Sequence, residues 1–139
     1  MNRIEELQKR FYEEPCVAAI GMDLVIMNEG FVIVSMTINE RVTMKEGFAN
    51  GGFLAMLGNT AGVYAAMSKI PHGHTRMMSI GMHPVSPAMA GEYIIGSARV
   101  IQEGKQHIWV TFEIKNGNTR QLKAFGSAQY IKPKNDALS

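Results

Sequence analysis

A long apolar segment in the middle of the chain is its most distinctive feature. Residues 50–67 are apolar almost throughout, which is typical of a helix buried on several sides rather than along one stripe. Two glycines, Gly51 and Gly52, open the segment, and one amide, Asn59, lies in its middle. We predict a helix from residue 50 to about Lys69, whose first backbone N–H groups are free to face a ligand.

The residues before this segment predict one helix and a pair of strands. Apolar residues recur at helical spacing over residues 4–14, and Pro15 is expected to end that helix. Residues 17–27 have mixed apolar character, and residues 31–38 are rich in β-branched side chains. An Asn-Glu-Gly turn separates the two stretches, which favours an antiparallel hairpin. A polar loop is expected over residues 39–49.

Four further strands are predicted after the long helix, and most of them are joined by short turns. They are expected over residues 75–85, 92–102, 106–115 and 122–131. An Asn-Gly dipeptide at residues 116–117 is a strong hairpin signal between the last two. The fold class that follows is α+β, with a curved antiparallel sheet wrapped around a long central helix. Residues 133–139 form a polar tail.

Composition and charge restrict the class of protein. The 139 residues fit one domain, and 46% hydrophobic with 19% charged residues indicates a globular chain. A net charge of +2 with scattered lysines and arginines gives no sign of a nucleic-acid partner. No apolar run reaches the length of a membrane span, and no signal peptide is recognised. With its single cysteine, Cys16, the chain is expected to be cytoplasmic and without a membrane partner.

Other chemistry has little support in the sequence. His72 and His74 form a His-x-His pair, but no further ligands are placed near them, so no metal site is expected. The chain has no nucleophile elbow, phosphate loop or dinucleotide fingerprint. Its 11 methionines are typical of core filling, and for a few of them a flexible acyl pocket is the alternative.

Three segments carry a resemblance to a known family. They read Gly-Phe-Ala-Asn-Gly-Gly at 47–52, Asn-Thr-Ala at 59–61 and Met-His-Pro-Val-Ser-Pro-Ala-Met-Ala-Gly-Glu at 82–92. In combination they resemble the hot-dog fold, within it the phenylacetyl-CoA thioesterase-like branch of acyl-CoA thioesterases. The resemblance covers nearly the whole chain. It implies a single hot-dog domain over residues 1–139, with an N-terminal helix over residues 1–14.

The polar positions of the family pattern are changed in this chain. The family usually has a histidine where Asn50 stands and an aspartate where Asn59 stands, whereas Gly51 and Gly52 match. Met44 stands where the family often has an asparagine, and a water-positioning hydroxyl of some members falls near Met77. The resemblance implies that the Gly51 N–H binds the developing oxyanion and that Asn50 and Asn59 occupy the remaining catalytic positions.

Several of these residues keep a structural alternative. Asn50 is a helix N-cap or a substrate ligand, and Thr60 is a satisfied helix hydroxyl or orients water. Glu46 is a solvated loop carboxylate or a substitute base. The resemblance also implies a groove for coenzyme A along residues 79–87. Its expected lining residues, with two near its outer end, are Ser79, Ser86, Pro87, Gln102 and Lys105.

The spacing of the two asparagines bears on assembly. Asn50 and Asn59 are nine residues apart, about two and a half helical turns and about 13 Å along the axis. They point to roughly opposite sides, so one copy of the chain cannot easily bring both to one carbonyl. A symmetric dimer can, by facing the start of one helix to the middle of the other. We therefore expect a homodimer or a dimer of dimers.

Two classes of function remain open from the sequence. The first is an acyl-CoA thioesterase that hydrolyses a small acyl- or aryl-CoA, with Asn59 replacing the usual aspartate. The second is a non-catalytic acyl-CoA-binding protein, a sensor or carrier. In both, coenzyme A belongs to the ligand, and no separate cofactor is expected.

Overall fold

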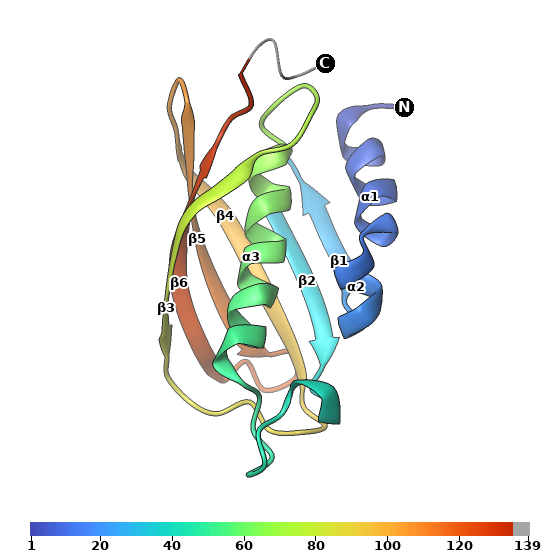
Figure 1. Cartoon of the computed structure of the whole chain (residues 1–139), viewed down its shortest axis with the longest axis vertical. Coiled ribbons are helices and arrows are strands. Elements are labelled where there is room, and N and C mark those ends of the chain that lie inside the picture. Colours follow the sequence, from blue (N-terminus) through green and yellow to red (C-terminus); the bar gives the residue numbers. More distant parts are fainter. Residues whose placement is uncertain (135–139) are drawn as a thin grey trace.

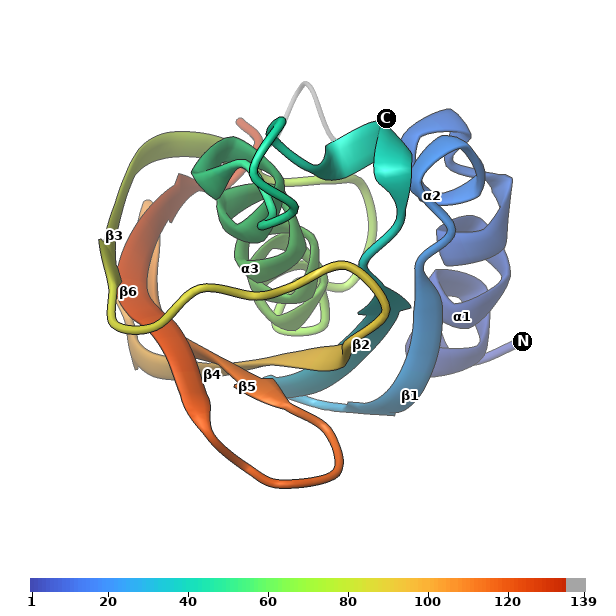
Figure 2. The same cartoon turned by 90° about the horizontal axis from the view of Figure 1, so that it is seen from below.

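One long helix, α3 (Gly51–Met67), lies in the concave side of a six-stranded antiparallel sheet (Figure 1). The structure is a computed structural model that describes residues 1–134, and the predicted polar tail lies outside them from residue 135 onward. Seen from below, the strands form an open ring around α3 (Figure 2). The α+β architecture predicted from the sequence is confirmed.

The sheet has the strand order β1-β2-β4-β5-β6-β3. Its strands are β1 (Asp23–Asn28), β2 (Phe31–Thr37), β3 (Arg76–Pro84), β4 (Tyr93–Glu103), β5 (His107–Asn116) and β6 (Leu122–Ile131). The bounds of β3 to β6 lie within one residue of the predicted ones. Helix α3 connects β2 to β3 across the concave side. β3 pairs with β6 alone and therefore forms one edge of the sheet.

The burial of α3 explains its unusual composition. The helix is buried on several sides by β2, β4, β5 and β6, so it carries apolar or small residues around most of its circumference. Gly58 permits the closest approach to the sheet, because a Cβ at this position would lie 2.5 Å from the Phe112 ring. The helix ends at Met67, two residues before the predicted end.

The N-terminal part differs from the prediction in one place. Helix α1 (Arg3–Glu13) forms as expected, and its Phe11 packs edge-to-face on Tyr64 of α3 at 5.4 Å between ring centroids. Pro15 does not lead into a strand but begins a second helix, α2 (Pro15–Ile20). Proline is well tolerated at the first helical position, where its missing N–H has no acceptor to lose. The predicted strand over residues 17–27 was therefore wrong over its first part, and β1 begins only at Asp23.

The predicted polar loop over residues 39–49 is more structured than expected. It contains a short 3₁₀ helix, η1 (Glu40–Val42), and an isolated bridge between Thr43 and Ala49. A second bridge joins Phe48 to Met89, in the segment after β3. The loop and this segment are thus held together beside the start of α3.

Candidate active site

Asn50 caps the start of α3. Its side-chain Oδ1 accepts a hydrogen bond from the Gly52 backbone N–H at 2.8 Å, and its Nδ2 lies 3.4 Å from the Met44 sulfur. The Gly52 N–H is therefore already hydrogen-bonded within the chain. Gly51, as the first helical residue, keeps an N–H without an intrahelical acceptor, at the positive end of the helix dipole.

An apolar groove of about 330 Å³ lies beside Gly51. It runs between the start of α3 and the segment that follows β3, and its lining residues are Phe48, Ala49, Gly51, Leu54, Pro84, Val85, Ser86, Pro87 and Ala88. Ser86 is half-buried, and its hydroxyl donates to the Leu122 carbonyl at 2.6 Å. The groove thus combines apolar walls with a backbone donor at one side.

A buried lysine fixes the far wall of this groove. Lys123 on β6 is only 2% exposed, and its Nζ donates to the Pro87 carbonyl at 3.0 Å, to Glu92 Oε1 at 2.9 Å and to Gln121 Oε1 at 2.9 Å. Glu92 also accepts from the Met89 N–H at 2.7 Å. Burial alone would raise the pKa of Glu92, but the hydrogen bonds from Lys123 and Met89 and the lysine charge outweigh it, so the pKa lies below its usual value.

Asn59 is half-buried in the middle of α3, on the side that faces β6. Its Oδ1 accepts a hydrogen bond from the Tyr130 hydroxyl at 2.8 Å. The neighbouring Thr60 is buried, and its hydroxyl donates to the Met56 carbonyl at 2.8 Å, as a satisfied helix hydroxyl does. Of the two, Asn59 alone retains free side-chain donors for a ligand.

The other predicted site residues lie away from the groove within one chain. Glu46 is exposed and does not line it, and Met77 and Ser79 are exposed on the β3 edge. Gln102 is exposed near the end of β4, which by strand register lies at the end of the sheet opposite Gly51. One copy of the chain therefore brings together the start of α3, Ser86 and Pro87, but not Glu46, Met77, Ser79 or Gln102.

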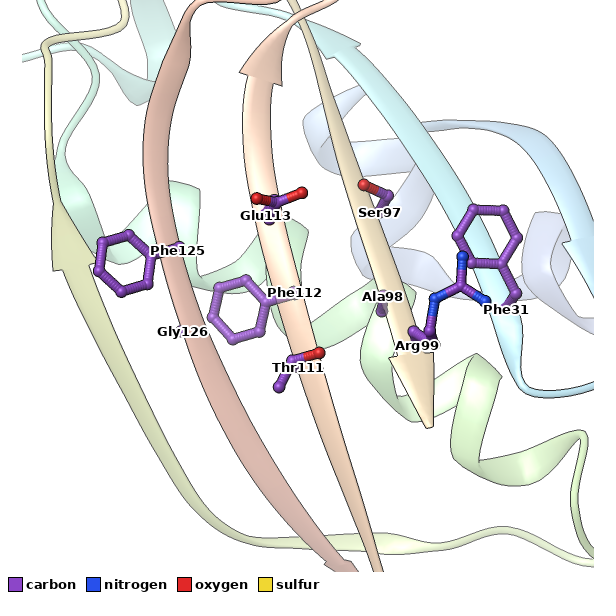
Figure 3. Close-up of a pocket in the computed structure, with 9 residues that line it drawn as sticks. All are labelled: Phe31, Ser97, Ala98, Arg99, Thr111, Phe112, Glu113, Phe125 and Gly126. Atoms are coloured by element: carbon purple, nitrogen blue, oxygen red, sulfur yellow. The ribbon is translucent and has the colours of Figure 1, made fainter. Parts of the chain in front are cut away.

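A larger hollow of about 490 Å³ lies on the outer face of β4, β5 and β6, with α3 behind the sheet (Figure 3). Its charged lining residues are Arg99 and Glu113, and the Arg99 guanidinium lies 4.4 Å over the Phe31 ring. None of the predicted site residues lines it, so it is no part of the candidate site. Within residues 1–134, no group of three or more His, Cys, Asp or Glu side chains is arranged to hold a metal ion. In the same range, no helix is both long and apolar enough to cross a membrane.

Comparisons with known proteins agree with this architecture. No protein-family model matches the chain. The acyl-coenzyme A thioesterase PaaI of Escherichia coli (strain K12) is 29% identical over 115 residues, covering 83% of this chain and 81% of that protein.

Solved structures extend the likeness to nearly the whole fold. The E. coli PaaI protein from the phenylacetic acid degradation operon superposes with a TM-score of 0.88 at 26% identity, covering 95% of this chain and 94% of that one. A Streptococcus mutans UA159 protein, solved bound to acetyl-CoA, gives a TM-score of 0.75 at 18% identity, covering 81% and 90%. The chain thus has the hot-dog fold and is similar, over most of its length, to PaaI-like members of the thioesterase superfamily.

Proposed function

We propose that this chain is an acyl-CoA thioesterase that hydrolyses a small acyl- or aryl-CoA at a site shared between two copies. The observation that carries the proposal is the free Gly51 N–H at the start of a buried helix, directly beside the apolar groove. A thioester carbonyl gains negative charge during hydrolysis, and a fixed backbone donor reinforced by a helix dipole stabilises that charge. The E. coli relative, itself named an acyl-CoA thioesterase, supports the same chemistry.

The size and polarity of the groove support a small acyl or aryl group. Its volume of about 330 Å³ lies at the lower end of ligand pockets, and its walls are mostly apolar side chains. The phosphates of coenzyme A need polar surroundings and remain outside such a groove. We place the pantetheine arm along residues 79–87, which lead from the β3 edge to the groove.

The free edge of β3 supports a site that is shared with a second copy of the chain. This strand has nine residues, and Met77 and Met78 on it are 46% and 56% exposed. A long, apolar and unpaired edge strand is a ready template for another strand. Antiparallel pairing of two β3 edges about a twofold axis turns the Gly51 end of one α3 toward the middle of the other, where Asn59 lies.

The amide of Asn59 favours the alternative of binding without turnover. A carboxamide does not titrate in the useful range, so Asn59 cannot act as a general base or as a carboxylate nucleophile. Water activation then lacks its usual group at this position, and hydrolysis by the natural chain is expected to be slow. An acyl-CoA sensor or carrier needs only the groove and the donors.

Binding and hydrolysis measured side by side test the proposal. Acetyl-, butyryl- and phenylacetyl-CoA are titrated by calorimetry, and released thiol is followed with a chromogenic disulfide. We expect binding with slow turnover by the natural chain and an increase in kcat of about 10²-fold in Asn59→Asp, the scale of one acid–base group. The Tyr130 hydroxyl is placed to donate to the new carboxylate, so the variant is expected to fold.

Glu46→Gln is the matched control for a substitute base. Since Glu46 is exposed outside the groove, we expect its amide variant to turn over at the parental rate. A large loss in Glu46→Gln would instead make this carboxylate the base. Binding of all three ligands without hydrolysis by any variant would replace the thioesterase proposal with the binding-protein alternative.

A further inference from the structure

The hydroxyl of Tyr130 is buried against α3 at Asn59. Tyr130 on β6 is 0% exposed, and its hydroxyl oxygen lies 2.8 Å from Asn59 Oδ1 and 3.3 Å from the Asn59 backbone carbonyl. Both neighbours are acceptors, so the phenol acts as the donor. Burial raises the pKa of Tyr130, which keeps the phenol protonated at neutral pH.

Gly62 makes room for this hydroxyl. It lies three residues after Asn59 on the same face of α3, and a Cβ at this position would lie 2.6 Å from the Tyr130 oxygen. Any other residue at position 62 would push the phenol away from Asn59. The glycine and the tyrosine therefore form one arrangement that holds the hydroxyl on the amide.

The other end of the amide is open. No hydrogen bond within residues 1–134 uses Asn59 Nδ2. In the same range, two fully buried polar side-chain atoms lack a partner, and Nδ2 is not one of them. Asn59 is half-buried and its Nδ2 is not fully enclosed, so a ligand can reach this atom from outside the chain. A carboxamide whose oxygen is held by one donor still presents its two Nδ2 hydrogens to a ligand.

We infer that Tyr130 is a positioning residue that holds Asn59 Oδ1, so that Asn59 Nδ2 donates a hydrogen bond to the carbonyl oxygen of a bound thioester. This inference rests on the proposed function for the identity of the ligand. Asn59 then acts as a second carbonyl donor beside the Gly51 N–H of the other copy. The same position that holds a carboxylate in the family is used here for the opposite purpose, to supply a donor.

Two coenzyme A analogues separate positioning from a general structural role. One is the ketone analogue of acetyl-CoA, in which a methylene replaces the sulfur and the carbonyl is retained; the other is S-ethyl-CoA, which lacks the carbonyl. We expect Tyr130→Phe to weaken binding of the ketone about tenfold and to leave S-ethyl-CoA binding within twofold. Equal losses for both analogues, or no loss for either, would overturn the inference.

Selective ¹⁵N labelling of asparagine tests the contact without any ligand. The Asn59 side-chain signals are assigned by their absence in Asn59→Asp. We expect Tyr130→Phe to shift them, whereas Tyr64→Phe leaves them in place, because the buried Tyr64 hydroxyl donates to Glu14 at 2.9 Å instead. Unchanged Asn59 signals in Tyr130→Phe would refute the contact. If neither analogue binds the natural chain, the proposed function fails while this measurement still decides on the contact.

Gly62→Ala supplies an independent steric test. Its methyl group is expected to displace the phenol and to shift the same Asn59 signals. In a Tyr130→Phe background the clash with the oxygen is gone, so adding Gly62→Ala should change these signals much less. Equal shifts in both backgrounds would contradict the arrangement.

A hydrogen bond from Asn59 to the thioester carbonyl also determines how Asn59→Asp changes KM and kcat. A carboxylate repels a carbonyl oxygen, so we expect KM to rise in the variant even as the new base raises kcat. A KM that falls or stays constant together with a higher kcat would show that the amide makes no contact with the thioester carbonyl.

Discussion

The ion pair between the buried Lys123 and the half-buried Glu92 provides a test of how the groove is held. Lys123→Met keeps the length of the side chain but removes the ammonium group. It leaves three acceptors without their donor: the Pro87 carbonyl, Glu92 Oε1 and Gln121 Oε1. Two of them hold the segment between β3 and β4, so the groove wall loses its anchor to β6.

The expected cost follows from burial. Removing one partner of a buried pair destabilises a protein by about 3–5 kcal/mol, because the remaining charge stays uncompensated. The Glu92 side chain is 24% exposed and keeps the Met89 N–H, so water and the backbone recover part of the loss. We therefore expect the free energy of unfolding to fall by about 3 kcal/mol, the lower end of that range.

Urea denaturation followed by circular dichroism measures this loss. With a slope of about 1.5 kcal/mol per molar urea, the midpoint should move down by about 2 M. Lys132→Met is the matched control, because Lys132 and Glu103 are 2.8 Å apart but more exposed, at 22% and 33%. Such a pair contributes about 0–1 kcal/mol. All variants are compared at one protein concentration, since association shifts apparent stability. Equal midpoints for the two lysine variants would refute the reasoning from burial.

Glu92 has a lowered pKa, so its contribution to stability is present above its ordinary pKa of 4.5 and is lost as the pH falls through the lowered value. The stability of Glu92→Gln should lack this pH-dependent loss. Identical acid unfolding curves for the parent and the variant would contradict the prediction. Gly51→Val should leave the melting temperature unchanged, since a Cβ there meets only the Met82 methyl group at 3.9 Å, but should weaken acetyl-CoA binding at least tenfold; affinity within twofold of the parent would place the site elsewhere. Light scattering should give at least twice the chain mass of 15.3 kDa, and Met78→Lys on the β3 edge should shift it toward one chain; a parental particle of one chain would exclude the shared site. Coenzyme A should shift the amide signals of residues 79–87, whereas shifts confined to α1 would argue against the proposed course of the pantetheine arm.

Most elements of the fold were predictable because their signals are local. The spacing of β-branched and apolar residues predicted β3 to β6 within one residue, and the uniform apolar composition of residues 50–67 predicted a helix buried on several sides. The error at Pro15 has a physical reason. Proline stops a helix that precedes it and equally well begins the next one, and the sequence alone does not distinguish the two.

Parts of the candidate site were predictable for the same reason. The Gly-Gly start of α3 and the mid-helix amide are visible in the sequence, and both lie where a ligand could meet them. Lys123 and Tyr130 were missed. Small or apolar residues occupy every second position of β6 from Leu122 to Tyr130, which places Tyr130 on the core side. Nothing in that pattern says which residue of α3 it contacts.

The sequence by itself determined the α+β class, the long buried helix and its polar exceptions, because these depend on neighbours close along the chain. Only the tertiary structure decided that the Asn50 side-chain oxygen caps the Gly52 N–H, that Lys123 anchors the groove wall and that the Tyr130 hydroxyl donates to Asn59. Tyr130 and Asn59 are 71 residues apart in the chain. Contacts of this kind depend on the register of strands and on the rotation of a helix over them, which no local pattern encodes.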